Sequence, residues 1–88
     1  MKRLPPLNAL RAFDAAVRTG SFTRAGDQLH VTQGAISRQI KQLEDWLGKP
    51  VFVRHYQGLI LTPAGSVLAK SLDMAFGTIT SAIEQIHH

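Results

Sequence analysis

The stretch from Ser21 to Arg54 constrains the fold of this chain more than any other part of the sequence. It predicts a short helix at Thr23–Leu29 and a longer amphipathic helix that runs from about Gln33 to Leu47. The polar corner between them, residues 30–32, is so short that the two helices must cross steeply. This arrangement is a helix-turn-helix, in which the second helix is shaped to enter the major groove of DNA.

The longer helix has two distinct faces when its residues are placed about 100° apart. Four apolar side chains fall within one narrow arc and are expected to be buried: Ile36, Ile40, Leu43 and Leu47. The residues expected to be exposed lie on the opposite side or at the N-terminal end: Gln33, Gly34, Ser37, Arg38 and Lys41. Amide, hydroxyl and cationic side chains of this kind contact base edges and phosphates, so this face is the predicted DNA-binding surface.

Capping and helix-breaking residues predict where the helices begin and end. A first helix is expected at Asn8–Thr19, with Asn8 as its N-cap. Thr23 and Thr32 are expected to cap the next two helices. Gly20 and Gly48 follow the first and third helices, in the position where glycine commonly ends a helix.

Two apolar triplets typical of strands predict a two-stranded hairpin, the wing: Val51–Val53 and Leu59–Leu61. They flank the polar segment 54–58, in which Arg54 is the permanent cation. Trp46 borders the apolar stripe of the preceding helix and is expected to pack beneath the wing. Tyr56 is expected at the wing tip, where it either contacts a DNA sugar or remains exposed.

Thr62 followed by Pro63 predicts the start of a last helix that continues to near the end of the chain. Its apolar residues repeat with the alternating spacings of a heptad seam, which favours pairing with a second helix. The residues expected to form this dimer seam are Leu68, Leu72, Ala75, Phe76, Ile79, Ile83 and Ile86. The alternative is that the helix folds back on its own domain. Self-association is favoured because an exposed stripe of this size is a liability in a monomer.

These elements together predict a mainly α fold. We expect a winged helix-turn-helix domain at residues 1–62, with three helices and a two-stranded wing, followed by a long linker or dimerisation helix at residues 63–88.

The excess positive charge of the chain lies in its first part. Residues 1–58, Lys2 included, carry nine Lys and Arg residues against four acidic residues, whereas residues 59–88 carry one Lys against two acids. A cationic surface of this kind favours an anionic polymer as partner.

Several classes of function are excluded by what the sequence lacks. It has no cysteine, and its histidines lack metal-ligand spacing, so neither a disulfide scaffold nor a metal site is expected. No apolar run is long enough for a membrane span and no signal peptide is evident, which favours the cytoplasm and the nucleoid. No nucleophile with a base and no phosphate-binding glycine loop is present, so we expect neither an enzyme nor a cofactor. The alternative to DNA binding is a protein–protein interaction module. Modules of that class tend to have an apolar or acidic outer face on the third helix.

The sequence also resembles the N-terminal domain of LysR-type transcriptional regulators. The residues that carry the match are Leu10, Phe13, Gly20–Thr23, Ala25, Leu29, Thr32-Gln33, Ser37–Ile40, Leu43-Glu44, Leu47-Gly48, Phe52, Arg54, Leu61-Thr62 and Ala64-Gly65. The opening segment 4–10 resembles the subgroup of glycine-cleavage and β-lactamase regulators. Gly26 and Gly34 depart from the family pattern, and a mid-helix glycine costs about 1 kcal/mol relative to alanine.

The resemblance implies sequence-specific binding to double-stranded DNA as a homodimer, on an interrupted inverted repeat. It also implies that a small-molecule effector acts only through a C-terminal sensor domain that this chain does not include. The residues that we expect to contact DNA are Thr23, Arg24, Thr32, Gln33, Gly34, Ser37, Arg38, Lys41 and Arg54.

Their expected roles differ. Gln33 can read adenine and Arg38 can fork onto guanine or phosphate, although a surface ion pair with Glu44 or Asp45 is the alternative for Arg38. Lys41 lies further along the helix and is expected to meet phosphate. The remaining residues are expected at phosphates, at a base edge or, for Arg54 in the wing, at the minor groove.

Overall fold

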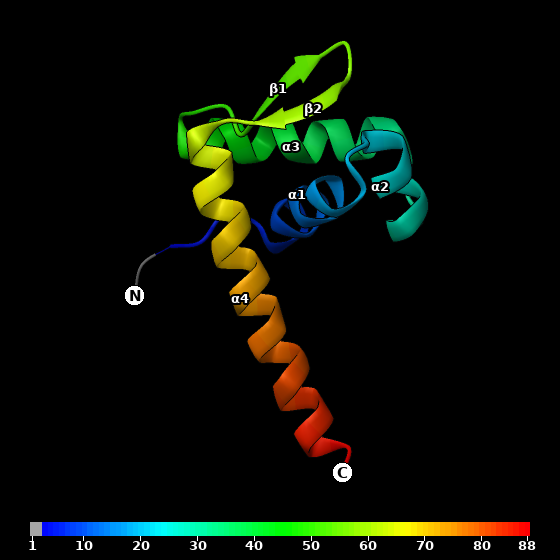
Figure 1. Cartoon of the computed structure of the whole chain (residues 1–88), viewed down its shortest axis with the longest axis vertical. Helices are drawn as coiled ribbons and strands as arrows, with labels where there is room; N and C mark the ends of the chain where they lie inside the picture. Colours follow the sequence, from blue (N-terminus) through cyan, green and yellow to red (C-terminus); the bar gives the residue numbers. More distant parts are fainter. Residues whose placement is uncertain (1–2) are drawn as a thin grey trace.

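The polar corner and the wing are both present in the computed structural model, which describes residues 3–88. Lys2, which contributes to the charge balance above, lies outside the described residues. The elements follow the predicted order: α1 (Leu7–Thr19), α2 (Phe22–Leu29), α3 (Gln33–Leu47), β1 (Phe52–His55), β2 (Gly58–Leu61) and α4 (Pro63–Ile86). In Figure 1 the hairpin lies beside α3, α1 packs on the other side of α3, and α4 extends well beyond the other helices. The predicted mainly α winged helix with a long C-terminal helix is confirmed.

Two of the four predicted caps are confirmed and two are wrong. Thr32 Oγ1 accepts a hydrogen bond from Ala35 N, and Thr62 caps α4 in the same way. Ser21, not Thr23, caps α2, because its side chain accepts from Arg24 N at 3.2 Å. The start moves back so that Phe22 enters the helix, where its ring packs edge-on against Phe52 with centroids 5.8 Å apart.

The start of α1 differs from the prediction as well. Pro6, not Asn8, is the N-cap residue, and it makes no side-chain cap hydrogen bond. The carbonyl oxygen of Pro6 instead accepts from the backbone N–H groups of Ala9 and Leu10. The cap therefore lies two residues before the predicted Asn8, and the helix begins at Leu7 instead of Asn8.

The core is built where α1 meets α3. The alanines of α1 are almost fully buried, and so are Phe13 and the α3 residues Ile36 and Leu43. Because alanine side chains are short, the two helices approach closely and bury the larger side chains between them. The predicted stripe on α3 is therefore confirmed, with Leu47 only partly buried at its end.

The corner between α2 and α3 is tighter than the sequence indicates. His30 ends α2 in the left-handed region at φ 60°, and Val31 N donates to Gly26 O at 2.9 Å. A Cβ atom on Gly26 would lie 2.7 Å from the Val31 carbonyl oxygen. Glycine at this position therefore lets the chain of the corner pass directly over α2.

The wing is longer than predicted and its turn is shorter. Strands β1 and β2 pair in antiparallel register from Phe52–Leu61 to His55–Gly58, which leaves only Tyr56 and Gln57 in the turn. The prediction follows the apolar triplets, but strand pairing continues into polar residues because backbone hydrogen bonds do not depend on side-chain polarity.

The expected position of Trp46 beneath the wing is wrong, because 42% of this residue is exposed. That space is filled by Phe52, whose ring lies 5.3 Å from the ring centroid of Phe13 and also contacts Phe22. Three phenylalanines from α1, α2 and β1 thus anchor the wing to the helices.

Helix α4 divides into two halves. In the first half, Leu72 is only 7% exposed and belongs to the core, and Leu68 packs against it. Phe76, at the start of the second half, also packs against the core. In the second half, Ala75, Ile79, Ile83 and Ile86 are exposed. The alternative of folding back on the domain therefore applies to the first half of the helix. The second half leaves exposed the stripe on which the expected self-association depends.

An ion-pair bridge also joins α4 to α1. Arg18 Nε lies 3.0 Å from Asp14 Oδ2, and an Arg18 terminal nitrogen lies 3.2 Å from Asp73 Oδ1. The hydrogen bond and charge of Asp14, with a smaller contribution from Asp73, raise the pKa of Arg18 above its ordinary value. The bridge is exposed, so salt screens it and the apolar contacts of α4 dominate its attachment.

The junction between wing and α4 depends on Gly65. Thr62 N donates to Val51 O, Thr62 Oγ1 donates to Pro50 O, and Gly65 is buried against the same segment. A Cβ atom on Gly65 would collide with the Val51 carbonyl oxygen and would lie 3.0 Å from Leu61 Cδ2.

We predict that Gly65→Ala destabilises the fold by about 1–3 kcal/mol, because the backbone at Val51 must move to admit the methyl group. Thermal unfolding followed by circular dichroism measures this change. Gly77→Ala is the matched control, since no described atom outside its immediate chain neighbourhood lies within 4 Å of a Cβ at Gly77. It should stabilise α4 by up to about 1 kcal/mol. Equal melting temperatures for the two variants would contradict the close approach at Gly65.

Candidate nucleic-acid interface

The outer face of α3 carries the polar residues predicted from the helix geometry. Gln33, Gly34, Ser37, Arg38 and Lys41 are all exposed. Their exposure follows from the burial of the opposite stripe, since a helix with one apolar face presents the other face to solvent. At Gly34, a Cβ atom would meet only Thr32 Oγ1, at 3.9 Å, so the backbone here is open to close approach by a ligand.

Arg38 carries an uncommitted guanidinium group. The two acids that the sequence offers as partners are engaged elsewhere: Glu44 Oε2 accepts from Val51 N at 2.8 Å, and Asp45 Oδ1 lies 3.1 Å from Lys41 Nζ. Within residues 3–88, no ion pair includes Arg38. Its fork of donors is therefore available for a planar acceptor such as a base edge or a phosphate.

Lys41 is held only loosely by Asp45. The two side chains are 74% and 66% exposed, and an exposed pair of this type contributes at most about 1 kcal/mol. An anionic ligand at this end of the exposed face can replace Asp45 as the partner of Lys41 at little cost.

A groove lies where the wing approaches the first turns of α2 and α3. We call it the wing groove. It has a volume of about 320 Å³, and its lining includes Thr23, Gln33, Arg54, His55 and Gly58. Three predicted site residues from three different elements, Thr23, Gln33 and Arg54, thus share one concave surface.

A second groove continues this surface along α3 beneath the wing. Ser37 and Lys41 line it from α3, and Arg54 lines it from β1. The Arg54 guanidinium carbon lies 5.3 Å from the centroid of the Phe22 ring, which orients its charge toward α2. Arg54 therefore joins the two grooves into one surface that extends from α2 across α3 to the wing.

The other predicted residues lie at the edges of this surface. Thr32 is exposed, and its hydroxyl oxygen already accepts the Ala35 N–H that it caps. Arg24 is exposed on the first turn of α2, next to Thr23. His55 lines the wing groove but lies outside the residue set predicted from the sequence. Its position beside Arg54 was visible in the sequence, but its place in the groove depends on the extended pairing of β1.

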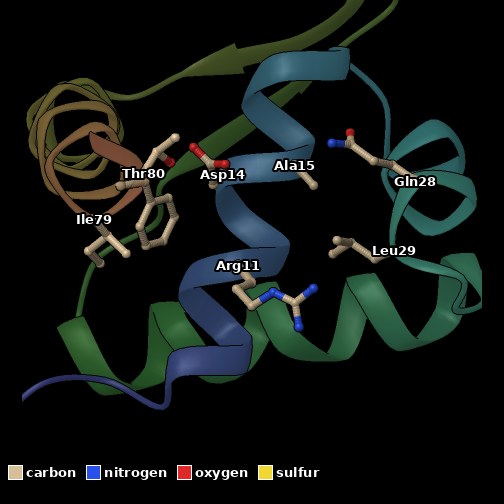
Figure 2. A pocket seen from close by; sticks show the side chains of 8 residues that line it. Arg11, Asp14, Ala15, Gln28, Leu29, Ile79 and Thr80 are labelled. Carbon is tan, nitrogen blue, oxygen red and sulfur yellow. The ribbon is translucent and has the colours of Figure 1, made fainter. Parts of the chain in front are cut away.

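The second exposed surface belongs to α4. A groove of about 360 Å³ separates the middle of α4 from α1 and α2. Figure 2 shows that its side chains come from all three helices: Arg11, Asp14 and Ala15 from α1, Gln28 and Leu29 from α2, and Ile79 and Thr80 from α4. Phe76 completes the lining. Part of the predicted dimer seam therefore faces this groove, while Ile83 and Ile86 lie beyond it on the protruding end of the helix.

The described part of the chain contains neither a candidate metal site nor a candidate membrane span. No group of three or more His, Asp or Glu residues between 3 and 88 is arranged to hold a metal ion. Over the same residues, no helix has the combination of length and apolarity that crossing a bilayer requires.

Comparison with known proteins shows which family the chain matches and which regulators are similar to it. Residues 7–66 match the family of bacterial regulatory helix-turn-helix proteins of the lysR type. The glycine cleavage system transcriptional activator of Escherichia coli (strain K12) is 51% identical over 85 residues, which are 97% of this chain and 28% of that protein. The transcriptional activator AmpR of Providencia stuartii is 50% identical over 80 residues, covering 91% of this chain and 27% of the relative. The chain thus spans little more than a quarter of the length of these curated relatives.

The fold also matches a solved DNA complex. The structure of the BenM DNA-binding domain (BenM DBD) bound to catB site 1 DNA superposes with a TM-score of 0.82 and 31% sequence identity, covering 92% of this chain and 91% of that one. The similarity therefore includes α4 as well as the winged helix.

Proposed function

Because the chain belongs to the lysR family of bacterial regulatory helix-turn-helix proteins, we propose that it binds double-stranded DNA through α3 and the wing, as the DNA-binding part of a transcription regulator. The observation that carries this proposal is the exposed polar face of α3, on which Arg38 has no ion-pair partner within residues 3–88. A protein-interaction module would tend to have an apolar or acidic face there. The related fold bound to catB site 1 DNA supports the same function.

The proposed contacts divide into base contacts and backbone contacts. Gln33, Ser37 and Arg38 lie on the exposed face of α3, and we assign them to base edges in the major groove. Gly34 lets the helix backbone sit close to the DNA. Lys41, Thr32 and the first turn of α2, with Thr23 and Arg24, are assigned to phosphates. Arg54 is assigned to the minor groove or its phosphates, next to the wing.

The proposed assembly is a homodimer. The exposed residues Ala75, Ile79, Ile83 and Ile86 form a stripe that has no cover within the described chain, and a second copy of α4 would bury it. In this proposal, residues 1–62 supply the DNA contacts and residues 63–88 link and dimerise the protein. The first half of α4, with Leu68 and Leu72, then transmits the dimer geometry to the core, because it packs against that core together with Phe76 just beyond it.

Two further proposals concern the whole regulator. Two recognition helices related by a dimer axis lie about one turn of DNA apart, roughly 34 Å, which corresponds to an interrupted inverted repeat. The curated relatives are more than three times as long as the matched segment. We therefore propose that a small-molecule effector acts through a part of the regulator outside residues 1–88, and that the regulator works on the bacterial nucleoid.

The first prediction of the proposed function concerns the DNA site. Selection of random duplexes on the purified protein should enrich an inverted repeat whose half-sites are centred about 10 base pairs, or a multiple of this, apart. A library with one fixed half-site and variable spacing provides the control for geometry. Enrichment of a single unpaired half-site would contradict the dimeric mode of binding, and no enrichment at all would contradict sequence-specific binding.

The second prediction separates base contacts from phosphate contacts on the same helix face. Arg38→Ala should weaken binding to the selected site by about 1–3 kcal/mol and affect random DNA much less, because base discrimination is lost. Lys41→Ala should weaken both kinds of DNA alike and reduce the slope of log affinity against log salt by about one unit per protomer. Fluorescence anisotropy titrations at several salt concentrations measure both effects. An equal loss on both DNAs for Arg38→Ala would remove its base-reading role.

The third prediction concerns the dimer. Ile79→Asp places a charge on the exposed stripe of α4 and should give monomers in sedimentation velocity, because burying an unpaired carboxylate is costly. Met74→Asp is the matched control, since Met74 is also exposed but lies about 140° from Ile79 around the helix. It should leave the dimer intact. Dimers that persist in Ile79→Asp would exclude this stripe as the interface.

A further inference from the structure

The tip of the wing combines a titratable side chain with the DNA-facing groove. His55 is exposed at the end of β1, pairs with Gly58 across the hairpin, and lines the wing groove with Gln33 and Thr23. Two contacts hold its imidazole in place. The Tyr56 ring centroid lies 4.2 Å from that of the imidazole, and Gln57 N donates a hydrogen bond to His55 Nδ1 at 3.2 Å.

The groups around His55 include no carboxylate in the described chain. From β1 it is faced by Arg54, and from β2 by the uncharged Gly58 and Leu59. Helix α2 and its N-cap residue present uncharged side chains from residues 21–23, and α3 presents the amide of Gln33. The neighbouring turn adds the phenol ring of Tyr56. A positive charge on His55 would therefore stand beside Arg54 without a counter-ion from the wing groove.

We propose that His55 is a further DNA-contact residue, and that its protonated form supplies the wing with a second cation that binds a phosphate of the DNA backbone. This inference rests on the proposed DNA-binding function. It extends that function by making the affinity of the wing for DNA depend on pH.

The direction of the effect follows from the hydrogen bonding of the imidazole. In the neutral ring, Nδ1 accepts the Gln57 N–H, so the ring proton is on Nε2. Protonation gives up this single exposed hydrogen bond between neutral groups and gains a charge-assisted contact with phosphate, which is roughly twice as strong. The presence of DNA favours the exchange, because the phosphate adds an anion to a groove in which the described protein offers only Arg54 as a charged group.

Proton uptake and DNA binding are therefore linked, and each favours the other. Histidine side chains change charge between about pH 5 and pH 8. The added affinity should be fully present at the acidic end of this range and should be lost as the pH rises and the imidazole of the complex releases its proton.

The test uses the selected duplex and four proteins: the wild type, His55→Gln, His55→Arg and, as the matched control, His30→Gln. His30 is also an exposed histidine, but it lies at the corner after α2, outside the lining of the wing groove. Anisotropy titrations at about pH 7.5 and about pH 5.8, over a range of salt concentrations, give affinities and salt slopes. Circular dichroism at both pH values checks that each variant is folded.

For the wild type, we expect affinity to rise at least about threefold per protomer at the lower pH, with a salt slope steeper by about 0.9 per protomer, because one more phosphate is neutralised. His30→Gln should behave in the same way. His55→Gln should lose both responses, and His55→Arg should bind tightly with a steep salt slope at both pH values. The NMR titration of the His55 ring should move to higher pH when DNA is added.

Other outcomes overturn the inference. If the wild type binds DNA equally at both pH values, or if His55→Gln keeps the full pH response, His55 is not the proton-linked contact, and the proposed DNA binding still stands. If the wild type binds neither selected nor random duplex at either pH, the proposed function fails and the inference fails with it.

Discussion

The packing of α3 on α1 is the constraint on which the rest of the structure depends. Fully burying an Ile, Leu or Phe side chain contributes about 1.5–3 kcal/mol, and Ile36, Leu43 and Phe13 are all buried where these helices meet. Once that stripe is buried, helical geometry exposes the opposite face of α3 to solvent. The polar residues of α3 that we assign to DNA are exposed because the apolar residues about half a turn away hold the core together.

The second determinant is the segment around Val51, which ties three elements together. Its N–H donates to Glu44 of α3, its carbonyl accepts from Thr62 at the start of α4, and its fully buried side chain belongs to the core. This arrangement holds the wing next to α3. It also engages the carboxylate of Glu44, one of the two acids that the sequence offers as partners of Arg38. Within residues 3–88, Arg38 is in no ion pair, so its guanidinium group remains exposed on the candidate interface.

Helix α4 connects the candidate interface to the proposed assembly. Its first half is part of the core through Leu72, while its second half extends away with an exposed apolar stripe. A rigid helix that is packed at one end and free at the other fixes the direction in which a second copy can approach. The orientation of two recognition helices would then follow from the attachment of α4 to α1, to which the exposed Arg18 bridge adds a salt-sensitive restraint.

The sequence by itself determined what depends on neighbours along the chain: the number and order of the helices, the caps Thr32 and Thr62, and the two faces of α3. These features follow from helical periodicity and from side chains that bond backbone groups three residues away. Only the tertiary structure decided what depends on distant residues. The cluster of Phe13, Phe22 and Phe52 fills the space beneath the wing in place of Trp46. Strand pairing brought His55 into the wing groove, and the segment after α3 placed Val51 N on the Glu44 carboxylate. Packing between elements outweighs local preference in these places because each contact joins residues that no sequence spacing brings together.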